Sequence, residues 1–408
     1  MQPCPRALPG SGDGAGAPAR PRVVDIFRAS GEMYEATHAL SSEQRRLLRD
    51  VQVCRTAALG GHLYACDQHD CGFELPLYNS CLNRHCPNCQ ALAQAKWIQA
   101  RTERLLPIGH YHVVFTLPGQ LRPLARRQPK LVFGALFSAV RETLTLLARE
   151  ALGVRLGVTA VLHTWTRELL FHPHVHCVVT AGGLSLDGER WIDRPGYLFP
   201  VARMKAVFRS RLLAVLQRER AASRLTLPTD GAQPDGAGWT KLLCSLPPKK
   251  KWVVYIEAPF KRSTHVLSYL GRYTHRIAIS NQRLISIGEH DVTFRTREDD
   301  TRTLPHDVFI GRFLQHVLPR GFHKIRHFGL YAPSGVRGPL RRAQELLGDG
   351  DRDVVDEPND DELPETWAEM LARITGDDPL VCPRCQIGRL REVLIGEPRS
   401  RGPPGSPP

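Results

Sequence analysis

The sequence predicts an α+β fold. Apolar stretches rich in Val, Ile, Phe and Thr, which are typical of strands, alternate with stretches whose apolar residues recur at helical spacing. The strand-like stretches look antiparallel and helices separate them, so α+β is the class that fits the middle of the chain. A segment near the N-terminus differs from both patterns, because it concentrates cysteines and histidines.

The composition limits the kind of protein this is. The chain has 408 residues, enough for two or three domains, and a net charge of +14, which favours a polyanionic partner such as nucleic acid. No run approaches the roughly 18–20 apolar residues of a membrane span, and the first residues lack the apolar core of a signal peptide. We therefore expect a cytoplasmic protein with no membrane partner. In a reducing compartment its eleven cysteines are not expected to form disulfides.

The elements follow one another as helices and strands of ordinary length. Residues 1–22, rich in Gly, Pro and Ala, are expected to be disordered. Ser41 and Gln44 have the spacing of a capping box at a helix start. Helices are predicted over 23–30, 41–52, 91–106, 129–152, 201–220 and 263–276. Strands are predicted over 110–118, 157–166, 169–181 and 249–260, with a two-stranded hairpin turning at 288–291.

Segment 54–89 contains six cysteines. Zinc binds about four N or S donors in a tetrahedron, and two cysteines separated by two to four residues supply two donors from one turn. The simplest structural zinc site joins two such pairs, Cys66 with Cys71 and Cys86 with Cys89. The remaining candidates for a second site are Cys54, His62, Cys81 and His85. A further pair, Cys382 and Cys385, has no partner pair downstream, and its role is left open.

The stretch FHPHVHCVV carries His172, His174 and His176 at alternate positions of a predicted strand. Alternate side chains share one face, and neighbouring Cβ atoms on that face lie roughly 6–7 Å apart. Two such imidazoles can converge on one metal ion, but all three cannot easily do so because the outer pair is about 13 Å apart. The alternative is a set of hydrogen-bonded histidines half-buried on a sheet.

Tyr269 and Tyr273 lie four residues apart in a predicted helix and therefore share one face. They could simply be core aromatics. The same short helix also carries Arg272 and Arg276, however, and the preceding strand begins with Lys249, Lys250 and Lys251. These cations would contact phosphates, and a phenol can attack a phosphodiester that a divalent metal polarises.

The ordered set of these motifs resembles a known family. The His174-Val175-His176 motif followed by Tyr-x3-Tyr resembles the HUH single-strand endonucleases, and the strand VVFTLP resembles the first conserved strand of their replication-initiator branch. The segments YNSCLNRHCPNCQ, HPHVHCVV and YLGRYTHRIAISN resemble, more narrowly, the rolling-circle transposases of the insertion sequence 91 family. The resemblance runs from about residue 30 to about residue 345.

The resemblance implies a central antiparallel sheet flanked by helices, with the histidine pair on a middle strand. It implies that Mg²⁺ or Mn²⁺ is held by His174, His176 and a third polar side chain. Among Glu168, His163 and His172 we favour Glu168, because a carboxylate suits a hard cation. The implied substrate is single-stranded DNA at the element ends and the target. Tyr269 and Tyr273 would form 5′-phosphotyrosine links, and one-tyrosine relatives keep the second of them.

These inferences give a division of the chain. We expect a tail over 1–22, a helical and zinc-binding domain over 23–106, a catalytic domain over 107–300, a helical extension over 301–347, and an acidic linker, short helix, CPRC segment and disordered tail over 348–408. Two other functions compete with transposition: a rolling-circle replication initiator that uses the same chemistry, and a zinc-containing DNA-binding regulator without catalysis. The basic charge disfavours a hydrolase of small molecules.

Overall fold

The computed structural model of the chain describes residues 20–89, 94, 96–98, 101, 104–196, 198–227, 237–260, 278–297, 300–348, 368–369, 371–372 and 376–396. The chain divides into two compact units, each described by itself below. The first unit contains Met1–Gln94, Ile279–Ile310 and Val354–Pro408, and the second contains Ala95–Ala278 and Gly311–Asp353.

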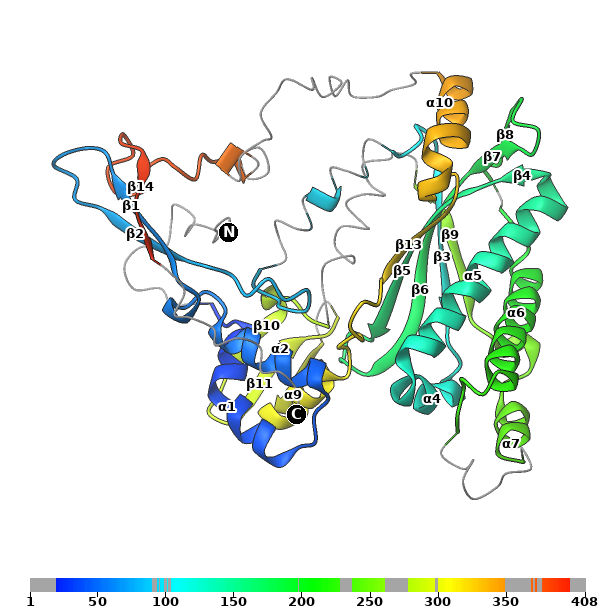
Figure 1. Cartoon of the computed structure of the whole chain (residues 1–408), viewed down its shortest axis with the longest axis horizontal. Coiled ribbons are helices and arrows are strands. Elements are labelled where there is room, and N and C mark those ends of the chain that lie inside the picture. Colours follow the sequence, from blue (N-terminus) through cyan, green and yellow to red (C-terminus); the bar gives the residue numbers. More distant parts are fainter. Residues whose placement is uncertain are drawn as a thin grey trace. The chain divides into compact units, whose positions relative to one another are not determined.

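A five-stranded antiparallel sheet forms the centre of the second unit (Figure 1). Its strand order is β13-β5-β6-β3-β9. The strand with the three histidines, β6, lies in the middle, as the resemblance implied. The strands are β3 (His110–Thr116), β5 (Gly157–Trp165), β6 (Phe171–Thr180), β9 (Val254–Phe260) and β13 (Ile325–Gly329). The predicted α+β class with a central antiparallel sheet is thus confirmed.

Helices cover one face of this sheet (Figure 1). They are α4 (Arg122–Arg127), α5 (Pro129–Leu152), α6 (Val201–Ala221) and α7 (Ala237–Ser245). Side chains alternate along a strand, so every second residue of β6 points toward the helices. Phe171, Val175, Cys177 and Val179 accordingly join the buried core together with residues of α5 and α6. The histidines occupy the intervening positions and therefore face the opposite side of the sheet.

One helix of this core, α5, is by length and composition apolar enough to cross a membrane, although the sequence analysis predicted no membrane span. Its most apolar window is 61% buried within the fold. Phe133, Leu136, Phe137, Val140 and Leu144 pack into the core on the helical face of the sheet. Core helices of globular proteins pass the same test, so α5 is weak evidence for a membrane span.

The second unit also contains a smaller sheet and a helix near its C-terminal end. A small sheet is formed by β4 (Val154–Arg155), β7 (Gly182–Ser185) and β8 (Trp191–Asp193). After β13 the chain enters α10 (Arg341–Leu347). Tyr331, which follows β13, lies in an apolar cluster with Leu106 and Leu184. The sequence analysis predicted only helices and loops after about residue 304, so it did not predict β13.

The described part of the first unit combines helices with two three-stranded sheets. Near its N-terminus lie α1 (Val23–Thr37) and α2 (Ser42–Val53), and the predicted capping box of Ser41 and Gln44 starts α2. One sheet has the order β14-β1-β2, from β1 (Gly61–Cys66), β2 (Glu74–Tyr78) and β14 (Leu390–Gly396). The other contains β10 (Leu284–Ile287), β11 (Asp291–Arg295) and β12 (Thr301–Pro305), and α9 (His306–Leu314) follows it.

Several boundaries differ from the sequence reading. The predicted hairpin exists as β10 and β11, but it belongs to the first unit rather than to the catalytic domain expected over 107–300. Lys249–Lys251 form a single 3-10 turn, so β9 begins only at Val254. The predicted helix 263–276 and half of the predicted helix 91–106 lie outside the described residues. The strand β14 was missed because it pairs with β1 at the other end of the chain.

Candidate functional site

Three histidines lie together on the face of the central sheet that is opposite the helices. His163 on β5 is directly paired in register with His174 on β6, and His176 is two residues further along β6. One nitrogen atom of each imidazole lies within 4.8 Å of the other two. Two nitrogens bound to one ion at about 2.1 Å can be at most about 4.2 Å apart, so small rotations suffice for all three to bind a single cation.

Burial favours the neutral form of His174 and His176. It lowers the pKa of His174 to about 4, an effect that the hydrogen bond to the His172 carbonyl partly opposes. Burial also lowers the pKa of His176 well below its usual value, and the neighbouring imidazoles His174 and His112 lower it further. A neutral imidazole has a lone pair available for a metal, whereas a protonated one does not. At neutral pH His174 and His176 are therefore in the form that can bind a metal.

A hydrogen-bonded chain orients His176. Nδ1 of His112 lies 3.0 Å from Oε2 of Glu257, and a carboxylate can only accept, so this nitrogen donates. The other nitrogen of a neutral His112, Nε2, is then an acceptor and lies 2.8 Å from Nδ1 of His176. Nδ1 of His176 therefore donates, and the lone pair that a metal could bind is on its Nε2. Such outer partners fix the tautomer and orientation of metal-binding histidines.

His174 is oriented by its own strand. Its Nδ1 lies 2.6 Å from the carbonyl oxygen of His172 and donates to it, which again leaves Nε2 with the lone pair. His172 itself is held by Arg122, whose Nη2 lies 2.6 Å from Nδ1 of His172. His172 is not part of the three-histidine cluster. This agrees with the estimate that the outer two of the alternate histidines are too far apart to share one ion.

The geometry favours His163 over Glu168 as the third ligand. Glu168 lies in the turn between β5 and β6 and is not part of the cluster. Its backbone N–H donates to Oγ1 of Thr166 at 3.2 Å, and its carbonyl accepts from Arg312 at 3.0 Å. His163 lies beside His174 because strand pairing, rather than proximity along the chain, brings the two residues together.

The predicted nucleophiles Tyr269 and Tyr273 lie outside the described residues, as do Arg272 and Arg276. Their positions relative to the histidines therefore stay predictions. The other predicted phosphate contacts, Lys249–Lys251, are exposed on the 3-10 turn that leads into β9.

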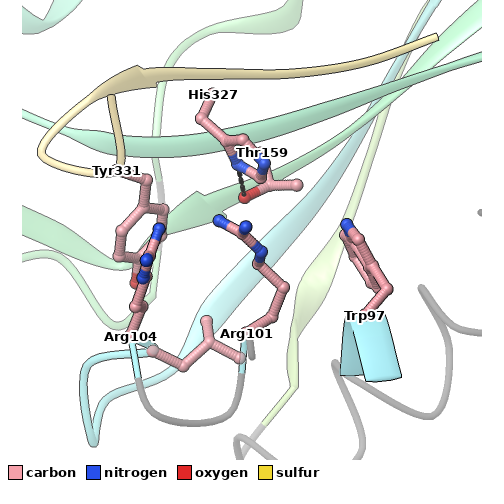
Figure 2. A pocket seen from close by; sticks show the side chains of 7 residues that line it. Trp97, Arg101, Arg104, Thr159, His327 and Tyr331 are labelled. Atoms are coloured by element: carbon pink, nitrogen blue, oxygen red, sulfur yellow. Dashed lines mark hydrogen bonds between the residues drawn. The ribbon is translucent and has the colours of Figure 1, made fainter. Parts of the chain in front are cut away.

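Arg101 and Arg104 line a pocket beside Thr159 of β5 and His327 of β13 (Figure 2), referred to below as the cationic pocket. Thr159 stands on β5 two positions from Val161 and four from His163, and its Oγ1 lies 3.1 Å from Nδ1 of His327 on β13. Burial lowers the pKa of His327 to about 4, and the charges of Arg101 and Arg104 lower it further. The lining residues are Trp97, Arg101, Arg104, Leu105, Thr159, His327 and Tyr331.

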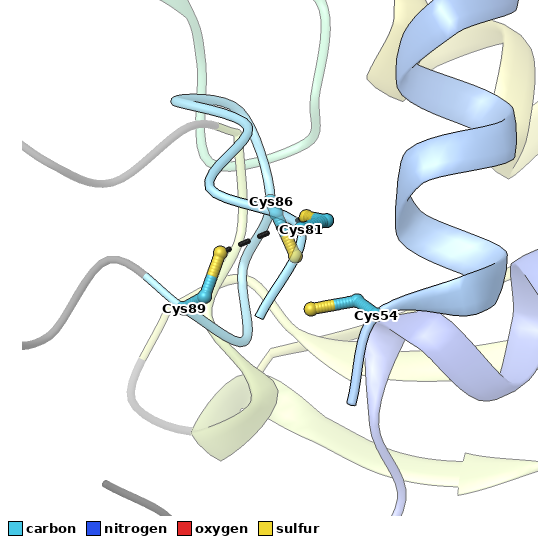
Figure 3. Close-up of side chains that lie close together, drawn as sticks. All are labelled: Cys54, Cys81, Cys86 and Cys89. Carbon is cyan, nitrogen blue, oxygen red and sulfur yellow. Dashed lines mark hydrogen bonds between the residues drawn. The ribbon is translucent and has the colours of Figure 1, made fainter. Parts of the chain in front are cut away.

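The first unit contains a buried cluster of four cysteines, which Figure 3 shows. Cys54 caps the C-terminal end of α2, and the other three lie in the loop after β2. The sulfur atoms of Cys81 and Cys89 are 3.7 Å apart, and each of the four lies within 4.8 Å of the others. Four buried sulfur ligands at this spacing fit a closed tetrahedral zinc site. This first cysteine cluster consists of Cys54, Cys81, Cys86 and Cys89.

The structure does not bring Cys66 and Cys71 together with Cys86 and Cys89, as the sequence analysis expected. Cys66 and Cys71 instead lie within 4.8 Å of Cys382 and Cys385. The expected second site fails for the same reason, because Cys54 and Cys81 complete their cluster with cysteines rather than with His62 and His85. His62 contacts Oε1 of Glu392 on β14 at 2.6 Å. Local spacing could not reveal this arrangement, since the partner pair comes from the far end of the chain.

Two family models match separate segments of this chain. A family model described as "Transposase zinc-binding domain" matches residues 26–117, and one described as "Putative transposase" matches residues 157–337. Over 386 residues the chain is 41% identical to "Putative transposase y4qJ" of Sinorhizobium fredii, which covers 92% of this chain and 95% of that relative. The chain belongs to the insertion sequence 91 family of transposases.

A second relative supports the same assignment. Over 318 residues the chain is 31% identical to the "Transposase for insertion sequence element IS801" of Pseudomonas savastanoi pv. phaseolicola, an alignment that covers 74% of this chain and 75% of the relative. No solved structure matches the chain. As a member of this transposase family, the protein acts on DNA, and its zinc-binding domain contains the first cysteine cluster in full.

Proposed function

We propose that this transposase cleaves and rejoins single-stranded DNA through a covalent 5′-phosphotyrosine intermediate, in rolling-circle transposition. The observation that carries the proposal is the cluster of His163, His174 and His176 on the middle of the central sheet. A regulator that only bound DNA would have no use for three neutral imidazoles converging on one point. A replication initiator would use the same chemistry, but both curated relatives are named transposases.

The donor set fits a catalytic divalent cation. His163, His174 and His176 would hold Mg²⁺ or Mn²⁺, which when bound would polarise the scissile phosphate. Three nitrogen ligands suit Mn²⁺ better than Mg²⁺, because Mg²⁺ prefers oxygen ligands. Glu257 and His112 would keep His176 in the tautomer that binds the metal.

The tyrosines would carry out a balanced exchange of phosphodiester bonds. The phenol oxygen of Tyr273 or Tyr269 would bond to phosphorus as the bond from phosphorus to the 3′-oxygen breaks. The phenol proton would leave to a base or solvent, and the departing 3′-oxygen would gain a proton. Attack by a free 3′-hydroxyl on the phosphotyrosine would reverse the exchange and join strands. One phosphodiester is exchanged for another in each step, so no energy-rich co-reactant is required.

The cationic pocket and Lys249–Lys251 would hold the strand. Single-stranded nucleic acid binds to cations that contact phosphates and to aromatic side chains that stack on bases. Trp97, Arg101 and Arg104 supply both kinds of group at one pocket. The first cysteine cluster would bind zinc in a structural role, because its four buried sulfurs leave no open position for a substrate.

The test incubates the full chain with single-stranded oligonucleotides from the element ends, with Mn²⁺ or with chelator. A protein–DNA adduct that survives denaturing electrophoresis, requires the metal and is absent from His174→Ala is the expected result. His174→Ala should still bind the oligonucleotide, since its basic surface is unchanged. The metal-binding role fails if His174→Ala forms the adduct as well as the wild type, and the phosphotyrosine mechanism fails if cleavage occurs with no covalent adduct.

A further inference from the structure

The pair Cys382-Pro-Arg-Cys385 belongs to neither matched region, since these cover residues 26–117 and 157–337. The proposed cleavage reaction does not use it either. The structure places this pair beside Cys66 and Cys71, which lie at the other end of the sequence but in the same unit. All four cysteines therefore lie together within one unit.

The sulfur spacing matches a zinc tetrahedron. Sγ of Cys66 lies 3.7 Å from Sγ of Cys385, and Sγ of Cys71 lies 3.7 Å from Sγ of Cys382. Four sulfurs at about 2.3 Å from one zinc ion are about 3.8 Å apart. A disulfide requires sulfurs about 2.05 Å apart, so these pairs stand at metal-ligand spacing rather than at bonding distance.

The backbone around Cys382 and Cys385 forms the tight turn that presents two sulfurs to one ion. The N–H of Gln386 donates to the carbonyl of Cys382 at 2.9 Å, and Gln386 adopts a left-handed conformation with φ of 57°. The N–H of Gly388 lies 3.3 Å from Sγ of Cys385 and donates to it. Hydrogen bonds from backbone N–H groups stabilise the thiolate form, which is the form that binds metal.

Position 388 shows how closely the two chain ends approach. A Cβ atom added to Gly388 would lie 2.4 Å from Sγ of Cys66 and 2.6 Å from Cγ of Gln68. No real Cβ atom tolerates such contacts, so any larger residue at 388 would displace Cys66. The glycine is thus required by the approach of the C-terminal turn to the end of β1.

The sheet that carries these cysteines packs on a small apolar cluster. Cys66 is the last residue of β1 and pairs in register with Leu390 of β14. Among the described residues, the apolar cluster beneath the sheet has four buried members, Tyr64, Leu77, Cys382 and Leu390, with partly buried neighbours that include the other three cysteines. A three-stranded sheet with so small a core is marginal, and small units of this kind commonly depend on a structural metal.

We infer that Cys66, Cys71, Cys382 and Cys385 bind a second structural zinc ion, which fastens the C-terminal strand β14 to the N-terminal zinc-binding domain. Four thiols would release their protons as the ion binds, and zinc would stay Zn²⁺ throughout, so no oxidant or reductant takes part. The functional zinc-binding domain would therefore include the C-terminal segment 376–396. This inference is independent of the cleavage chemistry.

The first measurement is the zinc content of the full chain, by elemental mass spectrometry. We expect two zinc ions per chain in the wild type and in Cys244→Ser, a matched control in an exposed cysteine outside both clusters. Cys382→Ser combined with Cys385→Ser should retain one. Gly388→Ala should also lose the second ion, whereas Ile387→Ala should keep it, because Ile387 is 81% exposed and adjoins the same turn.

The second measurement needs no variant, so it stands even if the cysteine variants fail to fold. Thiol alkylation of the native wild-type chain should label Cys244 rapidly and Cys66, Cys71, Cys382 and Cys385 only after a strong chelator is added. The inference is overturned if the wild type binds one zinc ion, or if those four cysteines react as fast as Cys244 while zinc is bound. It is also overturned if non-reduced peptides join them as disulfides.

Discussion

Nε2 of His112 lies 2.8 Å from Nδ1 of His176, and the two rings are stacked with an angle of 5° between their planes. The two residues stand on neighbouring strands, β3 and β6, of the central sheet. Glu257 on β9 accepts a hydrogen bond from the far side of His112. Three strands therefore contribute to setting which nitrogen of His176 carries the proton.

In the proposed metal site, Glu257 and His112 would act as positioning residues. Glu257→Gln should weaken Mn²⁺ binding by about tenfold or more, the range typical for loss of an outer-sphere partner. An amide can donate as well as accept, so His112 would no longer be held in one tautomer. Binding isotherms measured with Mn²⁺ test this. Glu289→Gln, in an 88% exposed carboxylate of the first unit, is the control. Equal affinities for the two variants would contradict the positioning role.

Substitution of His163 and of Glu168 tests which of the two is the third metal ligand. His163→Ala should reduce DNA cleavage by at least about a hundredfold while DNA affinity changes little, because the metal would lose one of three fixed ligands. Glu168→Gln should keep cleavage within a few fold of the wild type. Cleavage rates on a single-stranded oligonucleotide, with thermal unfolding run alongside, decide between them. A severe loss in Glu168→Gln with a mild one in His163→Ala would restore the carboxylate as ligand.

The free energy of unfolding should decrease as the pH is lowered, because of two fully buried histidines, His110 and His316. Burial lowers the pKa of each to about 4, from an unfolded value near 6.5. Each ring accepts a hydrogen bond at one nitrogen, from Tyr331 in one case and Thr164 in the other, and protonation removes that acceptor. The unfolded chain therefore binds more protons between pH 6.5 and 4. The stabilisation is complete above pH 6.5 and is lost as pH falls through this window.

The free energy of unfolding, measured by chemical denaturation at several pH values, tests this prediction. His316→Gln should show a shallower decline between pH 6.5 and 4.5 than the wild type. His69→Gln should decline as the wild type does, because His69 is fully exposed. Parallel curves for wild type and His316→Gln would show that His316 does not contribute to the pH dependence.

Single-stranded DNA affinity should depend steeply on salt. Lys249, Lys250 and Lys251 are exposed on one turn, and each phosphate contact adds about 0.7 to the slope of log affinity against log salt concentration. Replacing all three by glutamine should lower the slope by about 2 if all three contact phosphates. Filter-binding titrations between low and physiological salt measure it, and an unchanged slope would place the strand elsewhere.

The sequence predicted those features that depend on local pattern. The central helix α5, the strand β6 and the convergence of His174 with His176 all follow from periodicity within one segment. What it could not predict depends on pairing between distant segments. His163 reaches the site because β5 pairs with β6 in one particular register. Cys382 and Cys385 reach Cys66 and Cys71 because β14 pairs with β1, and no local spacing encodes that contact.

The central claim is that a tyrosine of this transposase becomes covalently linked to DNA. The most direct measurement is peptide mapping by mass spectrometry of an adduct trapped on a single-stranded oligonucleotide in the presence of Mn²⁺. We predict that the nucleotide is found on Tyr273 or Tyr269, that each single Phe variant still forms some adduct with Tyr273→Phe the weaker, and that the double Phe variant forms none. An adduct in the double variant, or a nucleotide mapped to any other residue, would contradict the account.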